Sequence, residues 1–147
     1  MKARSALNHA GKAANISAKF DVTTTYTRVG ADIIPTQKVI IAAPTDGTKI
    51  KVKSFTICMR DLPAGNKGCS VRFVSKGASN KYLTGLLSVP LAAGSEFGIP
   101  FEVPYSSHGY FEADSNAALT LSGSIAGAGT GTISPNFTGN IVYSLEQ

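Results

Sequence analysis

The chain has 147 residues, of which 43% are hydrophobic and 16% charged, with 15 glycines, 7 prolines and no tryptophan. A chain of this length fits one domain that folds without a disulfide or a metal, and this composition favours many short strands joined by turns. No apolar stretch approaches the ~18 residues of a membrane-spanning helix, and no apolar run follows Met1 as a secretion signal requires, so we expect a protein made in a cytoplasm, with no membrane segment.

Residues 1–19 form a polar, basic stretch that ends where strand periodicity begins. The stretch contains no acidic residue and too few apolar residues to bury a face of its own. We therefore expect an N-terminal extended arm over residues 1–19, followed by a single domain over residues 20–147. The basic side chains of this arm are the predicted partner-binding residues: Lys2, Arg4, Lys12 and Lys19.

From Phe20 onward, apolar and β-branched residues alternate with a period of two, which is typical of a half-buried strand. Further strands are expected over residues 37–43, 48–60, 69–76, 80–88, 95–103, 108–113, 117–123 and 137–145. Turn formers separate them, as in the stretch from Pro44 to Gly47. The glycine-rich stretch 123–131 lacks the lysine and the helix of a phosphate-binding loop, so it is expected to be a loop at the sandwich edge. The pattern predicts an all-β fold, an antiparallel two-sheet sandwich that is jelly-roll-like.

The charges are distributed unevenly along the chain. Residues 1–81 contain all 14 lysines and arginines and 4 acidic residues, a net charge of +10, whereas residues 82–147 contain 5 acidic residues, a charge of −5. The charge pattern argues against nucleic acid as a partner, because the basic residues are neither interleaved with aromatic ones nor clustered on a helix. Complementary contacts between copies, or with an acidic neighbouring protein, use the same asymmetry. Lys49, Lys51 and Lys53 alternate with Ile50 and Val52, as on the solvent face of a strand.

Cys58 and Cys69 flank a stretch rich in turn formers. We expect them to lie near each other across a hairpin, as free thiols in a reducing compartment. A zinc site needs further ligands at metal spacing, and neither His9 nor His108 supplies them. The sequence therefore predicts no metal and no cofactor.

Residues suited to catalysis are few. The imidazole bases are His9 in the arm and His108 in an expected surface turn, so no nucleophile and base are predicted to converge. Glu102 and Glu112 stand between apolar neighbours, as solvent-facing strand residues do, which argues against a carboxylate pair for glycoside cleavage. We expect no enzymatic activity. A lectin-like module is the alternative of a different class, with a stacking surface formed by tyrosines: Tyr26, Tyr82, Tyr105 and Tyr110.

Four segments follow a recognisable succession of strands and turns: GTKIKVKSFTI (47–57), LTGLLSVPLAAGSEF (83–97), GIPFEVPYSSHGYFEADSNAALTLS (98–122) and TGNIVYSLEQ (138–147). This pattern, over about 100 residues, resembles small β-sandwich proteins of tailed-phage virions. The resemblance implies a role in virion assembly without fixing the location, and we expect a capsid decoration or cement protein, made in the host cytoplasm and located in the virion. We expect it to bind the major capsid protein or other virion proteins and to form a homo-oligomer, with a trimer favoured. A neck, tail or fibre protein is the alternative within this group, and the group has no catalytic residues to carry over.

Overall fold

The computed structural model describes residues 14–23, 26–29, 32–35, 37–60, 66–89, 101–127, 132–133 and 136–147. The strands over these residues are β1 (Ile16–Thr23), β2 (Tyr26–Val29), β3 (Asp32–Pro35), β4 (Lys38–Ile41), β5 (Lys49–Arg60), β6 (Asn66–Lys76), β7 (Asn80–Tyr82), β8 (Leu87–Val89), β9 (Phe101–Val103), β10 (Phe111–Glu112), β11 (Ala118–Gly127), β12 (Thr132–Ile133) and β13 (Asn136–Glu146). The described residues include no helix able to cross a membrane.

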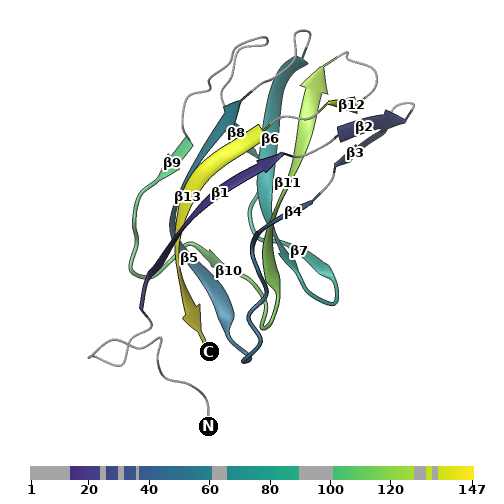
Figure 1. Cartoon of the computed structure of the whole chain (residues 1–147). Coiled ribbons are helices and arrows are strands. Elements are labelled where there is room, and N and C mark those ends of the chain that lie inside the picture. The colour runs from purple at the N-terminus through teal and green to yellow at the C-terminus, as the bar shows by residue number, and fades with distance from the viewer. Residues whose placement is uncertain are drawn as a thin grey trace.

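Most strands belong to two antiparallel sheets, which form the two layers of a sandwich (Figure 1). The first sheet has the order β1-β13-β5-β10, and β9 also pairs with β5. The second sheet has the order β4-β11-β6-β7, and β8 also pairs with β6. A small sheet, β12-β2-β3, lies at one end of the sandwich (Figure 1). The predicted all-β, two-sheet antiparallel sandwich is confirmed.

The strand pairing of the sandwich is nested along the chain. β1 pairs with β13, β4 with β11, β5 with β9 and β10, and β6 with β7 and β8. The outermost strands in the sequence pair with each other, and each pair that follows lies inside the one before it in the sequence. This is the pattern of one long antiparallel ribbon that is folded into two layers. This arrangement puts the first and last strands of the sandwich side by side in the first sheet (Figure 1).

The core lies between the two sheets and contains a cluster of aromatic rings. The rings of Phe55 in the first sheet and Phe73 in the second meet edge to face, with centroids 4.9 Å apart. The ring centroid of Phe111, in β10, lies 5.1 Å from that of Phe73. Alternate residues of the long strands supply the other fully buried side chains, among them Phe137, Ile50, Ile57, Met59, Leu119, Leu121 and Ile141. Burial of this apolar surface is the main force that joins the sheets.

A β-bulge in β5 interrupts the alternation of inward and outward side chains. Two consecutive residues of β13 pair with Val52 and Ser54, so Lys53 is the extra residue. The expectation of three solvent-facing lysines therefore holds for Lys49 and Lys51, which are half-buried, and is wrong for Lys53, which is buried. The bulge depends on the register with β13, which the local sequence pattern does not contain.

The first strand begins earlier than expected. β1 starts at Ile16, four residues before Phe20, because Ile16 and Ala18 continue the period-two pattern toward the N-terminus. Lys19 pairs with Asn140 of β13, so residues 16–19 of the expected arm belong to the first sheet, and the division of the chain into an arm and a domain stays a prediction. The other predicted partner-binding residues lie outside the described residues: Lys2, Arg4 and Lys12.

Two further expectations are corrected by the sheet topology. Cys58 lies in β5 and Cys69 in β6, and these strands belong to different sheets, so the two cysteines do not face each other across a hairpin. Residues 123–127 of the glycine-rich stretch form the end of β11, since the glycine backbone pairs with β6 as any other residue does. Residues 128–131 lie outside the described residues.

Candidate interaction site

The β9–β10 loop, residues 104–110, lies along the bulge of β5. The backbone N–H of Ser106 donates to the carbonyl of Lys53 at 2.9 Å, and that of Tyr110 donates to the carbonyl of Val52 at 2.9 Å. Gly109, which has a φ of 75°, donates to the carbonyl of Ser106 at 3.0 Å and closes a turn inside the loop. Glycine adopts this left-handed conformation without steric cost. Main-chain hydrogen bonds therefore fix the loop near both of its ends.

Lys53 fixes the middle of the loop. Its Nζ donates to the carbonyl of Ser107 at 2.6 Å and lies 3.2 Å from Oε1 of Glu146. The side chain of Lys53 is 7% exposed and that of Glu146 is 30% exposed. A buried ammonium group is costly unless it is paired and hydrogen-bonded. The loop carbonyl and the carboxylate near the chain end therefore stabilise Lys53 together, and the lysine in turn holds the loop against β5 and β13.

The fixed loop presents two tyrosines to solvent. Tyr105 is 55% exposed and Tyr110 is 47% exposed. The hydroxyl of Tyr110 donates to the carbonyl of Pro104 at 2.6 Å, and Nδ2 of Asn15 donates to the hydroxyl of Tyr105 at 2.9 Å. Since Asn15 precedes β1, the loop is joined to the start of the first strand, at the opposite edge of the same sheet. Exposed tyrosines on a rigid support are typical anchors of protein interfaces.

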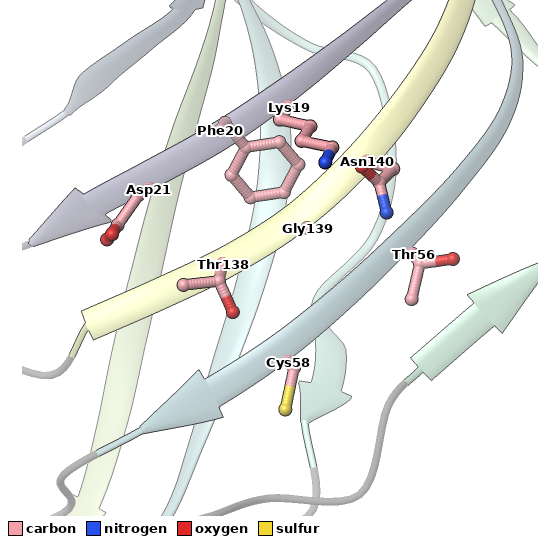
Figure 2. A pocket seen from close by; sticks show the side chains of 8 residues that line it. All are labelled: Lys19, Phe20, Asp21, Thr56, Cys58, Thr138, Gly139 and Asn140. Carbon is pink, nitrogen blue, oxygen red and sulfur yellow. The ribbon is translucent and has the colours of Figure 1, made fainter.

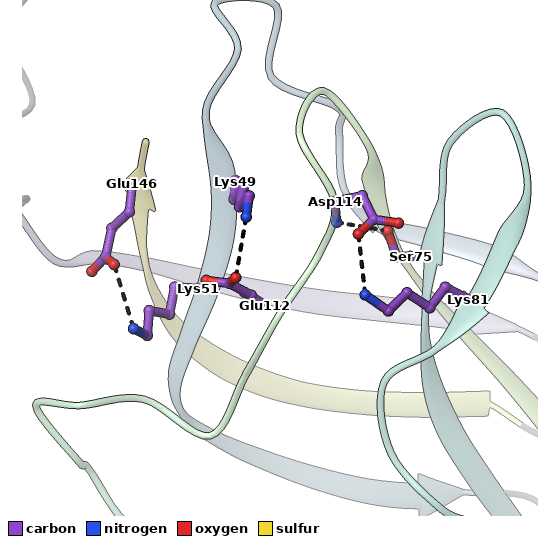
Figure 3. Close-up of polar contacts among 7 residues, drawn as sticks. All are labelled: Lys49, Lys51, Ser75, Lys81, Glu112, Asp114 and Glu146. Atoms are coloured by element: carbon purple, nitrogen blue, oxygen red, sulfur yellow. Dashed lines mark hydrogen bonds and ion pairs between the residues drawn. The ribbon is translucent and has the colours of Figure 1, made fainter.

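Ion pairs extend from this region across the end of the sandwich toward the second sheet. Figure 3 shows three of them: Lys51 with Glu146 (3.5 Å), Lys49 with Glu112 (3.3 Å) and Lys81 with Asp114 (3.2 Å). The N–H of Asp114 also donates to Oγ of Ser75 in β6 at 2.9 Å. Late acidic residues thus pair with early lysines inside one chain, which weakens the expectation that the uneven charges serve contacts between copies. Exposed pairs of this kind stabilise a fold by about 0–1 kcal/mol each.

The pKa of Glu146 lies below its ordinary value of 4.5. Burial raises this pKa, but the hydrogen bonds from Ser144 and Lys53 and the charges of Lys53 and Lys51 lower it by more. A carboxyl whose pKa is lowered by folding stabilises the folded state above its unfolded pKa. This contribution is lost as the pH falls through the folded pKa.

Replacing Glu146 by glutamine is expected to lower the free energy of unfolding at pH 7 by about 1–3 kcal/mol. The loss is smaller than for a fully buried pair, because Glu146 is partly exposed. Urea titrations from pH 7 to pH 3 should show the difference between the two proteins shrinking below pH 4.5, where the carboxyl of the unfolded chain takes up a proton, until the native carboxylate is protonated as well. Glu112→Gln, at an exposed pair, is the matched control and should change stability by less than about 1 kcal/mol. Equal losses for both variants would contradict the role given to Lys53.

A second feature of the same sheet is a shallow hollow on its outer face. The hollow has a volume of about 470 Å³ and crosses β1, β13 and β5 (Figure 2). Its lining consists of Lys19, Phe20, Asp21, Thr56, Cys58, Thr138, Gly139 and Asn140. Among the predicted partner-binding residues, Lys19 is thus placed at a depression lined with an amine, a carboxylate, hydroxyls and an amide. Such groups suit hydrogen bonds with polar side chains of a partner.

The candidate catalytic residues that the structure describes are not brought together, and His9 lies outside the described residues. His108 is exposed in a turn of the β9–β10 loop, and Glu102 and Glu112 are exposed on β9 and β10, as expected. No group of three potential metal ligands occurs within the described residues. The tyrosines proposed as one sugar-stacking surface are divided, because Tyr82 belongs to the second sheet while Tyr105 lies in the loop along the first.

The contact between Lys53, Ser107 and Glu146 has no counterpart in the sequence analysis. Lys53 is 54 positions from Ser107 and 93 positions from Glu146 in the sequence, and strand pairing together with the path of the β9–β10 loop brings the three residues into contact. In the sequence, Lys53 is the third lysine of a run that alternates with apolar residues, and this alternation predicted a solvent-facing side chain.

No protein-family model matches the chain, and no curated protein matches it significantly in sequence. Similar solved structures include the infectious bursal disease virus VP2 subviral particle (TM-score 0.46, 11% identity), T=1 particles derived from infectious bursal virus (0.48, 12%) and the infectious bursal disease virus Gx strain (0.47, 12%). Each match covers 90% of this chain and 32–33% of the other, so this chain spans about a third of their length. These viruses are of another kind than the tailed phages that the sequence pattern resembles. Similarity at this level decides no function.

Proposed function

We propose that the chain is a virion structural protein that binds other virion proteins through the outer face of its first sheet. The β9–β10 loop is the observation that carries the proposal. It exposes Tyr105 and Tyr110 while its backbone is fixed by Lys53 and by main-chain hydrogen bonds. Tyrosine is enriched at protein interfaces, and a surface that is already ordered loses little conformational entropy on binding.

The nested strand pairing supports the jelly-roll part of the proposal. The jelly roll is a double-sheet architecture used by viral capsid and lectin domains. Because one fold serves many functions, the proposed function rests on the exposed tyrosines of the β9–β10 loop and not on the jelly-roll fold. The resemblance of four segments to tailed-phage β-sandwich proteins supports a role in virion assembly, for which we propose capsid decoration or cementing, with a neck, tail or fibre protein as the alternative.

A second contact is proposed for the basic residues near the N-terminus: Lys2, Arg4, Lys12 and Lys19. Lys19 borders the hollow on the outer face, and Asn15 contacts Tyr105, so the chain enters β1 beside the proposed binding surface. Basic side chains there suit an acidic major capsid protein or another acidic virion protein. A homo-oligomer, with a trimer favoured, gains strength from several such contacts acting together.

Binding assays on particles that lack the chain test this function. Replacing Tyr105 and Tyr110 together by serine is expected to lower the affinity for such particles at least about 10-fold, since interface tyrosines each contribute more than ~1 kcal/mol. Tyr82→Ser is the matched control, because Tyr82 is equally exposed but lies on the second sheet. Circular dichroism of both variants checks that each of them is folded. Normal binding by the double variant, or loss of binding by the control, would contradict the assignment.

A further inference from the structure

The second sheet carries charges of one sign. Its strands β4, β6, β7, β8 and β11 contain five lysines and arginines and no aspartate or glutamate. Three of these basic residues, Arg72, Lys76 and Lys81, lie in the hairpin formed by β6 and β7. The exposed turn of this hairpin, residues 77–79, is also without acidic residues. The hairpin is therefore a basic surface element on the layer opposite the β9–β10 loop.

An exposed aromatic ring stacks with one of these cations. The guanidinium carbon of Arg72 lies 3.7 Å from the centroid of the Tyr82 ring. Tyr82 is 60% exposed and pairs across the hairpin with Val74, which is fully buried. Arg72 stacks on the Tyr82 ring beside the buried Val74, and much of the ring surface still faces solvent. Strand pairing creates here the alternation of basic and aromatic groups that the linear sequence lacks.

Two cations near Tyr82, Arg72 and Lys76, are not neutralised by carboxylates of the described residues. Arg72 and Lys76 form no ion pair within the described part of the chain, and Nε of Arg72 has no hydrogen-bond partner there. They are four residues apart on one face of β6, a distance of roughly 13 Å. Lys81 pairs with Asp114, but both side chains are more than half exposed, and salt screens such a pair.

We propose that the β6–β7 hairpin binds single-stranded nucleic acid, with Tyr82 stacked on a base and with Arg72 and Lys76 contacting phosphates. Stacking on an aromatic ring beside basic groups is the common mode of single-strand binding without sequence preference. An acidic protein surface is the weaker alternative, because acidic side chains pair with the cations but leave the exposed face of the Tyr82 ring unused, whereas a nucleotide supplies both a phosphate for the cations and a base that stacks on the ring. The hairpin lies on the second sheet, so this binding is independent of the proposed virion contacts of the first.

Fluorescence anisotropy with a labelled 15-nucleotide poly(dT) tests the proposal on the full chain. Tyr82→Ala is expected to lower the affinity at least about 5-fold, the lower limit for loss of one stacked base, and Tyr82→Phe should retain it. Tyr105→Ala is the matched control, an exposed tyrosine on which no arginine of the described residues is stacked. In the double variant Arg72→Gln/Lys76→Gln, the fall in affinity between 50 and 200 mM salt should be smaller than in the native chain by about 7-fold, as expected for two lost phosphate contacts.

A 15-residue polyglutamate peptide of matched charge separates nucleic acid from an acidic protein. Tighter binding of the oligonucleotide than of the peptide, with the difference removed by Tyr82→Ala, supports the proposal. Equal binding of the two probes would show attraction by charge alone and would overturn it. Loss of affinity in the Tyr105→Ala control that equals the loss in Tyr82→Ala would also overturn it, because the contact would not then belong to the hairpin.

Discussion

Replacing Phe73 by alanine is expected to lower the free energy of unfolding by about 3–5 kcal/mol, the usual cost of removing a buried phenylalanine ring. Phe73 is fully buried and contacts the rings of Phe55 and Phe111 from the opposite sheet. Its loss leaves a cavity between the sheets that the rigid strands on either side fill poorly. Because Phe111 is in β10, the cavity also loosens one end of the β9–β10 loop.

Urea denaturation followed by circular dichroism measures this loss. Leu86→Ala is the matched control, since Leu86 is half exposed and its removal leaves no buried cavity. The control should change the free energy of unfolding by less than about 1 kcal/mol. A Phe73→Ala protein as stable as the Leu86→Ala protein would show that the aromatic cluster does not join the two sheets.

Replacing Gly139 by alanine is expected to destabilise the chain by about 3 kcal/mol or more, above the usual range for overpacking. A Cβ at Gly139 would overlap the carbonyl oxygen of Thr56 in β5 and lie 2.6 Å from Cζ of Phe20 in β1. The carbonyl oxygen of Thr56 is a backbone atom, so a change of side-chain rotamer cannot relieve this overlap. The substitution therefore forces β13 away from β5 or β1, in the middle of the sheet that carries the proposed binding surface.

Gly85 provides the control for this second substitution, because a Cβ at Gly85 would meet nothing within 4 Å. Gly85→Ala should change the free energy of unfolding by no more than about 0.5 kcal/mol. Thermal unfolding of the two variants side by side distinguishes a steric effect from the general effect of a glycine replacement. Similar melting temperatures for the two variants would refute the close packing of β1, β13 and β5 at Gly139.

The long strands were predictable because one face of each is buried. The expected strand at 137–145 corresponds to β13 and the one at 48–60 to β5, within about one residue at each end. The expected strand at 80–88 divides into β7 and β8, and that at 108–113 shrinks to β10. Short strands at the edges of sheets depend on which neighbour they meet, and that neighbour is distant in sequence.

The candidate site was less predictable than the fold for the same reason. The buried Lys53 results from a bulge against β13, and its two partners come from other strands and loops. The stacking of Arg72 on Tyr82 likewise requires the register of β6 with β7. The sequence indicated which residue types were present, but their juxtaposition follows from pairings made between distant strands.

Electron cryomicroscopy of purified particles that contain the chain tests the central claim most directly. The proposed virion contact predicts density of a neighbouring protein against the β9–β10 loop, at Tyr105 and Tyr110, and against the outer face of β1 at Lys19. The predicted contact covers the first sheet and leaves the loop in the conformation held by Lys53. A chain whose β9–β10 loop and outer first-sheet face are exposed to solvent in the particle would contradict it.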